Sequence, residues 1–152
     1  MLREKVEILE HHQSFIIFVQ NLKALDESQL RKPIAENKWS IIEIIGHFHP
    51  WDEFVLRYRI PHLLTGECLP KGPKADDLNT QSSFLARTES VENTFQKCIS
   101  IRKELLNMLR QIPEDNWFIE LQINQSNLKL YEYLKGLMEH DLHHINQIQS
   151  SI

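Results

Sequence analysis

The segment His140-Asp141-Leu142-His143-His144-Ile145-Asn146-Gln147-Ile148 contains three histidines within five residues. The apolar residues around it recur with the period of a helix: Leu130, Tyr133, Leu134, Leu137, Ile145 and Ile148. On such a helix His140 and His144 are one turn apart on the same face, within about 60° of the apolar stripe. His143 lies about 120° away from that stripe. We therefore expect His140 and His144, but not His143, to point into the protein, where they can bind one metal ion.

An inward-facing histidine pair also has a simpler interpretation. Buried histidines are often hydrogen-bonded core residues that have no ligand. Burying two unpaired imidazoles costs free energy, which either a metal ion or a hydrogen-bond network must offset. From this segment alone, both interpretations remain open.

The composition is that of an ordinary soluble protein. A chain of 152 residues fits a single domain, 1–152, and is long enough to bury a core. Hydrophobic residues make up 41% and charged residues 25%, and the net charge of −4 offers no basic surface for nucleic acid.

Cysteine usage and hydropathy indicate the compartment. Cys68 and Cys98 form no CxxC motif and no disulfide framework, which is compatible with a reducing cytoplasm. The N-terminus is charged where a signal peptide would be apolar, and no apolar run approaches the roughly eighteen residues of a membrane span. We expect a cytoplasmic protein that binds neither membranes nor nucleic acid.

Apolar periodicity predicts four amphipathic helices. They cover residues 3–25, 40–64 and 83–111, and a stretch from Asn127, as N-cap, nearly to the C-terminus. The connectors are 26–38, a loop 67–82 and 114–127, the last with a short extended piece. Four such helices predict an all-α fold, a four-helix bundle.

Two adjacent histidines, His11 and His12, lie in the first predicted helix. Adjacent helical residues point about 100° apart, so at most one of the two can face the core. We expect both at the surface or the edge of the helix.

The second helix has the clearest start. Ser40 is a natural N-cap, and Glu43 three residues later completes a capping box. Trp39 and Ile44 can form a hydrophobic staple around it. Pro50 should bend the helix, and Gly46 four residues earlier relieves crowding there. The helix should stop at Gly66, and His47 leans toward its apolar side.

Two charged residues also fall in apolar stripes. Asp52 could form a local ion pair with Arg57 or Arg59, or it could orient an imidazole that binds a metal. Arg102 in the third helix either snorkels from an apolar surface or meets a carboxylate of a substrate.

Sites in bundles are built from facing helices, so His47 can meet His140 and His144. Three imidazoles around a divalent ion leave positions open for water or substrate, and zinc, nickel or iron would accept them. Two other metal motifs do not match. A zincin requires His-Glu-x-x-His, but Asp141 replaces the glutamate. A di-iron bundle requires two Glu-x-x-His pairs, and here only one carboxylate, Asp141, has this spacing to a histidine, His144. Nucleophilic catalysis by either cysteine has no support beyond the thiol itself.

Two segments resemble a known family. Asn37-Lys38-Trp39-Ser40-Ile41-Ile42-Glu43-Ile44-Ile45-Gly46-His47 resembles the second-helix signature of the DinB/YfiT superfamily, and the segment 140–148 resembles its fourth-helix signature. Tyr58-Arg59 is similar to a Tyr-Arg pair common after the first motif. The resemblance implies a four-helix bundle, commonly dimeric, with a divalent metal held by His47, His140 and His144. His49-Pro50 departs from the small or aliphatic residues usual there, which can alter the pocket.

The resemblance also implies a class of activity, since the superfamily includes metal-dependent transferases and isomerases that use low-molecular-weight thiols. The favoured function is a transferase in which the metal binds such a thiol, lowers its pKa and presents the thiolate to a small electrophile. The alternative is a hydrolase that uses a metal-bound hydroxide, with Asp52 or Glu53 as proton acceptor. A third possibility is a non-catalytic metal-binding stress-response protein.

Overall fold

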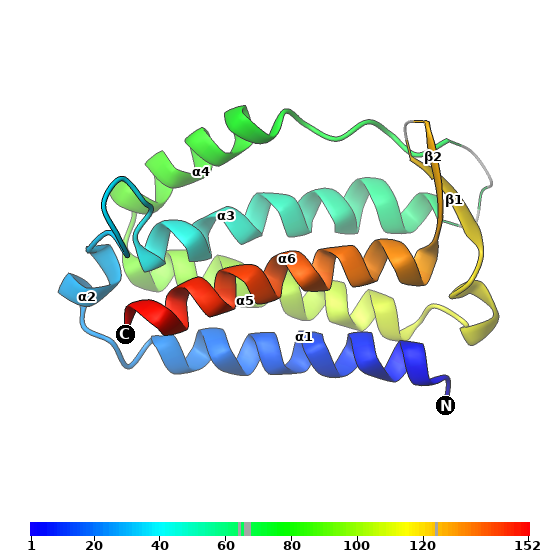
Figure 1. The fold of residues 1–152 in the computed structure, drawn as a ribbon, viewed down its shortest axis with the longest axis horizontal. Helices are drawn as coiled ribbons and strands as arrows, with labels where there is room; N and C mark the ends of the chain where they lie inside the picture. Colours follow the sequence, from blue (N-terminus) through cyan, green and yellow to red (C-terminus); the bar gives the residue numbers. More distant parts are fainter. Residues whose placement is uncertain (64, 66–67, 124) are drawn as a thin grey trace.

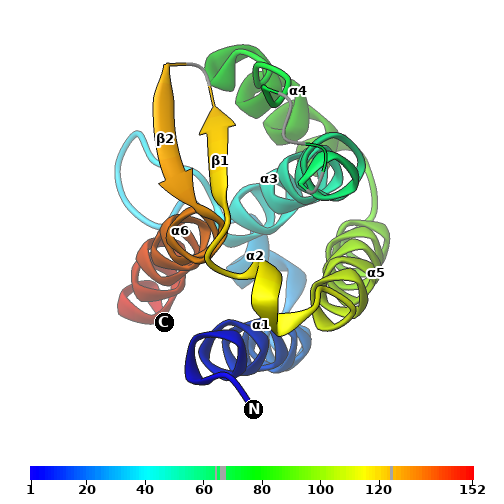
Figure 2. The same ribbon diagram turned by 90° about the vertical axis from the view of Figure 1, so that its right-hand side faces the viewer.

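Four long helices form the body of the protein. The structure is a computed structural model that describes residues 1–63, 65, 68–123 and 125–152. The helices are α1 (Arg3–Leu22), α3 (Ile41–Phe54), α5 (Val91–Arg110) and α6 (Leu130–Ser151). In Figure 1, α1 and α6 run in one direction, and α3 and α5 run in the other. The end view in Figure 2 shows the four helices around a common centre, which confirms the predicted four-helix bundle. None of the described helices is long and apolar enough to cross a membrane.

Two further helices among the described residues were not predicted: one lies in the expected connector 26–38, and the other spans parts of the expected loop 67–82 and of the expected helix 83–111. The helix α2 (Glu27–Arg31) lies between α1 and α3, and α4 (Ala75–Thr88) packs along the outside of α3 (Figure 1). The prediction of one helix over 83–111 was therefore wrong, because α4 and α5 are separate. Ser90 ends the connection between them by capping α5, where its hydroxyl accepts a hydrogen bond of 3.1 Å from the Asn93 amide.

The approach of α4 to α3 explains Gly46. A Cβ atom added at Gly46 would lie 2.9 Å from the Cβ of Ala86, closer than side chains pack. Gly46 is therefore needed for the contact between the two helices, whereas we had expected it to relieve crowding near Pro50.

The start of α3 is as predicted, but its end is different. The Ser40–Glu43 capping box is present in both directions. Pro50 lies inside α3, which continues to Phe54 and then into a wider π turn, η1 (Val55–Arg59), and a short 3-10 turn, η2 (Ile60–His62). The predicted end at Gly66 falls outside the described residues. Within η1 Arg59 is buried, whereas Arg57 is exposed.

A two-stranded hairpin lies at one end of the bundle (Figure 2). After the turn η3 (Glu114–Asn116), the strands β1 (Glu120–Ile123) and β2 (Ser126–Lys129) pair antiparallel. This confirms the predicted extended piece and corrects the start of α6, since Asn127 belongs to β2 and Lys129 precedes the helix.

The core consists of two apolar clusters. The cluster near α2 contains Phe15, Ile16, Val19, Leu30, Ile41, Ile45, Phe48 and Ile148 among its buried members. The cluster near the hairpin contains Ile8, Val55, Leu56, Leu105, Leu109, Trp117, Leu130 and Leu134. The four bundle helices also carry a group of neighbouring polar side chains: His12 on α1, His47 and Asp52 on α3, Arg102 on α5, and His140, Asp141 and His144 on α6. We call this group the polar layer, and it contains the candidate functional site.

Candidate metal centre

Three histidines from two helices meet in the polar layer. Ligand nitrogens of His47, His140 and His144 all lie within 4.8 Å of one another. The ring centroid of His47 is 4.6 Å from that of His144 and 5.7 Å from that of His140. The predicted meeting of α3 and α6 is thus observed. His143 is exposed and outside this group, as its position on the helix predicted.

Hydrogen bonds fix the orientation of two of the three rings. The Nδ1–H of His47 donates to the carbonyl of Ile44, and the Nδ1–H of His144 donates to the Gln147 side chain at 2.8 Å. In each neutral imidazole the lone pair of Nε2 is then free to bind a metal. Burial lowers the pKa of His47 to about 3 and also lowers the pKa values of His140 and His144. The three rings are therefore neutral at pH 7, as ligands must be.

The donor set fits a divalent ion. A tetrahedral zinc ion with bonds of about 2.1 Å needs ligand nitrogens about 3.4 Å apart, which a small contraction of this group would provide. Three imidazoles leave at least one coordination position open. Nickel and iron accept the same donors.

A buried ionic network lies next to the triad and connects all four bundle helices. The Arg102 guanidinium on α5 donates to both oxygens of Asp52 on α3, at 2.7 and 3.1 Å, and to both oxygens of Asp141 on α6, at 2.7 and 3.2 Å. From α1, His11 bonds Asp141 at 2.8 Å, and the ring of Phe15 lies 3.7 Å from the Arg102 Cζ. Because Asp141 directly follows His140, the network helps to fix the register of α6 at the triad.

The network corrects the predictions for Asp52 and Arg102. Asp52 pairs with Arg102 instead of Arg57 or Arg59, and no hydrogen bond joins it to a triad histidine among the described residues. Arg102 is 2% exposed, so it does not snorkel, and its donors are used by protein carboxylates. Burial raises the pKa of Asp52 to about 6, although Arg102 opposes this shift. Burial would also raise the pKa of Asp141, but the guanidinium of Arg102 holds it well below the usual range.

The histidines of α1 are more buried than predicted. The His11 side chain is 7% exposed and His12 is 5% exposed, so the expectation of surface positions was wrong. The reason is that α5 and α6 both pack against α1, and together they cover two neighbouring faces of that helix. Burial lowers the pKa of His12 to about 3, and nearby Arg102 acts in the same direction.

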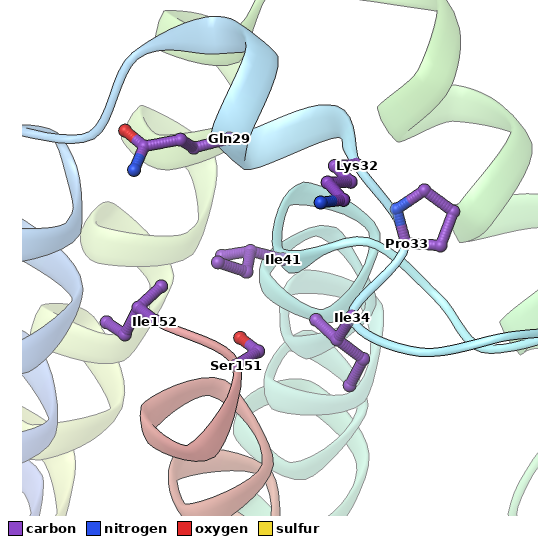
Figure 3. Close-up of a pocket in the computed structure, with 7 residues that line it drawn as sticks. All are labelled: Gln29, Lys32, Pro33, Ile34, Ile41, Ser151 and Ile152. Atoms are coloured by element: carbon purple, nitrogen blue, oxygen red, sulfur yellow. The ribbon is translucent and has the colours of Figure 1, made fainter.

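Each of two cavities is lined by one histidine of the triad. A cavity of about 390 Å³ is lined by His140, Asp52 and the apolar side chains of Trp51, Val55 and Leu137, among others. A second, of about 240 Å³, is lined by His144 and Trp39. A third cleft, about 220 Å³, lies between α2 and the C-terminal end of α6 and contains no histidine (Figure 3).

Neither cysteine has the surroundings of a catalytic thiol. Cys98 is fully buried, and burial raises its pKa. Cys68 is exposed, and it is not among the described residues that line the cavity beside His140. The described part of the site therefore offers metal ligands and carboxylates but no thiol nucleophile.

The fold and site define a class: a four-helix bundle with three histidines from two helices around one point. The sequence profile of the DinB superfamily matches residues 12–148, and the chain belongs to this superfamily. No curated protein gives a significant sequence match.

Solved structures show the same fold at low identity. YfiT from Bacillus subtilis, reported as a probable metal-dependent hydrolase with an unusual four-helix bundle topology, matches with a TM-score of 0.78 and 15% identity over 99% of this chain and 87% of its own. A mycothiol-dependent maleylpyruvate isomerase matches with a TM-score of 0.73 and 16% identity over 97% of this chain, which spans only 63% of the isomerase. A histidine-to-alanine mutant of that isomerase gives a TM-score of 0.73 and 15% identity, with the same coverage of 97% and 63%.

Proposed function

We propose that His47, His140 and His144 bind a divalent metal ion, and that zinc or nickel is preferred over iron. We further propose that the protein is a transferase that activates a low-molecular-weight thiol for attack on a small electrophile. The observation that carries this proposal is the convergence of three neutral imidazoles, one of which lines a cavity of about 390 Å³. When bound, the ion would supply the positive charge that makes a nearby thiol ionise at neutral pH.

The need for an external nucleophile supports a thiol cosubstrate. Cys98 is buried and Cys68 is not among the described residues lining the cavity, so neither of them is placed to attack a substrate held there. The solved isomerase of the same fold is named as mycothiol-dependent, which is consistent with a thiol in this role.

Asp52 is the residue we propose to accept the proton that the thiol loses. It lines the same cavity as His140, and burial raises its pKa to about 6, close to the pH at which a base must work. Glu53 is less suitable, because it is paired with His49 at 3.5 Å and is not among the residues lining this cavity.

Hydrolysis is the alternative function, with water in place of the thiol and Asp52 again as base. It is favoured by the likeness to YfiT, whose structure is reported as that of a probable metal-dependent hydrolase and covers nearly the whole chain. A metal-binding stress-response protein without catalysis is the third candidate.

A single set of assays separates the three candidates. Untagged protein is loaded with zinc or nickel and assayed for conjugation of 1-chloro-2,4-dinitrobenzene with a panel of small thiols, and for cleavage of p-nitrophenyl acetate without thiol. The thiol transferase predicts turnover that needs both metal and thiol and that is lost in His144→Ala but kept in His143→Ala. Ester cleavage without thiol would favour the hydrolase, and no turnover in either assay would favour the binding protein.

We also propose a cytoplasmic homodimer. Light scattering after size-exclusion chromatography tests the oligomeric state, and a mass of one chain would contradict it.

A further inference from the structure

The cavity beside His140 contains a second buried arginine, Arg59, which is only partly satisfied by hydrogen bonds within the described residues. Arg59 is 5% exposed, and its Nε and Nη1 atoms are buried without an acceptor among the described residues. Arg102 in the wall of the same cavity is different, because Asp52 and Asp141 occupy its donors. Within the described part of the chain, carboxylates thus neutralise the guanidinium of Arg102, and none is paired with that of Arg59.

The described residues around Arg59 hold it in place but supply no acceptor for its Nε and Nη1 atoms. Its Cζ atom lies 4.9 Å from the ring centroid of Phe54 and 5.8 Å from that of Tyr133. A Cβ atom added at Gly72 would be 3.8 Å from the Arg59 Nη2, so the extended chain before α4 passes close to the guanidinium. Aromatic faces stabilise a cation, yet they leave buried N–H groups unsatisfied, which costs free energy.

The missing acceptor is best supplied by a ligand. Asp52 shares the cavity, but its two oxygens accept hydrogen bonds from Arg102. A planar carboxylate matches the two parallel N–H donors of a guanidinium. The other walls include Trp51, Leu105 and Leu137, so the rest of the ligand should be apolar.

We propose that this cavity binds an organic carboxylate, with Arg59 as the residue that binds the anionic group. The same cavity is lined by His140, so a ligand held at Arg59 would extend its apolar body toward the triad. In that position the electrophile of the transferase is an organic acid. This last step rests on the proposed function, whereas the binding of the carboxylate does not.

The test uses binding to the metal-free full-length protein, measured by calorimetry. Phenylacetate and its neutral analogue phenylacetamide serve as probes. We expect phenylacetate to bind more tightly than the amide, and Arg59→Gln to weaken phenylacetate binding roughly ten- to a hundred-fold without affecting the amide. Arg59→Lys should fall between the two, because lysine keeps the charge but lacks the planar fork.

Arg57→Gln is the matched control. It removes the same charge from the same π turn but at an exposed position, and should leave phenylacetate binding unchanged. Circular dichroism melts of each variant separate loss of binding from loss of fold, and Arg59→Lys provides a variant that keeps the charge in the core.

Three results would overturn the proposal. Equal binding of acid and amide would show that the cavity does not recognise the anionic group. Equal losses in Arg57→Gln and Arg59→Gln would indicate a general charge effect. Phenylacetate binding that requires added zinc and survives Arg59→Gln would place the anion on the metal. A fourth result separates this proposal from the proposed function. If the thiol and ester assays both fail but phenylacetate binding depends on Arg59, the transferase and hydrolase chemistry is rejected and the carboxylate site is supported.

Discussion

Replacing Arg102 with methionine tests whether the ionic network stabilises the bundle as its geometry indicates. The substitution keeps most of the side-chain volume but removes the guanidinium that donates to both oxygens of Asp52 and Asp141. Asp52 is 7% exposed and Asp141 is 4% exposed, so two carboxylates would remain buried without their cation.

The expected loss is large. Removing one partner of a buried ion pair costs about 3–5 kcal/mol, because it leaves an uncompensated buried charge. In a chain of this size, each kcal/mol corresponds to roughly 2–4 °C in Tm, so Arg102→Met should lower Tm by roughly 6–20 °C.

The assay is urea unfolding of the metal-free protein, which avoids stabilisation by a bound ion. The control is the triple variant Arg102→Met, Asp52→Asn, Asp141→Asn, in which the guanidinium and both carboxylates of the network are removed. It should be more stable than Arg102→Met alone, because replacing a whole buried ionic group costs less than breaking it. A loss below about 1 kcal/mol in Arg102→Met, or a triple variant no more stable than the single one, would refute the reasoning.

Two further predictions concern helix packing and pH. Gly46→Ala should destabilise the protein by up to about 2 kcal/mol in urea unfolding, because the new Cβ would lie 2.9 Å from Ala86. Gly136→Ala, in a helix position with nothing within 4 Å of the new Cβ, should stabilise it by about 0.5–1 kcal/mol; equal effects at the two glycines would contradict the α3–α4 contact. The pKa of His12 is lowered to about 3 in the folded protein, so the unfolded chain binds the proton more readily. The contribution of neutral His12 to the free energy of unfolding is therefore fully present above pH 6.5 and is lost as the pH falls from 6.5 toward 3. His12→Leu should therefore reduce the loss of stability between pH 6 and pH 4 by up to about 1.4 kcal/mol per pH unit, and an unchanged pH profile would show that His12 is not buried in its neutral form.

The positions of the triad were predictable because local patterns determine them. Residues 140 and 144 share a helix face by spacing alone, and the capping box at Ser40 sets where α3 begins and hence where His47 lies along it. The separation of α4 from α5 also had a local signal, Ser90 as an N-cap, which the apolar periodicity running through it concealed.

The ionic network was not predictable in the same way. Arg102 is 50 residues from Asp52 and 39 residues from Asp141, so no spacing rule connects them. Periodicity showed that these charges point inward, but only the packing of four helices shows which of them meet. The same reason explains His12, whose burial depends on two helices that cover neighbouring faces of α1.

The burial of Arg59 was not predictable from the apolar periodicity, because this residue lies in a π turn. The turn Val55–Arg59 departs from the regular helical period, so a projection at 100° per residue does not place its side chains correctly. The absence of an acceptor for its guanidinium among the described residues is a tertiary property that no local pattern carries.

Metal content tests the central claim most directly. Protein purified without a histidine tag and dialysed against zinc is measured by elemental analysis, together with His144→Ala and the neighbouring control His143→Ala. We expect about one ion per chain in the wild type and in His143→Ala, and little in His144→Ala, because the open site would retain only two imidazoles. An ion retained at full stoichiometry in His144→Ala, or no ion in the wild type, would contradict the three-histidine metal site.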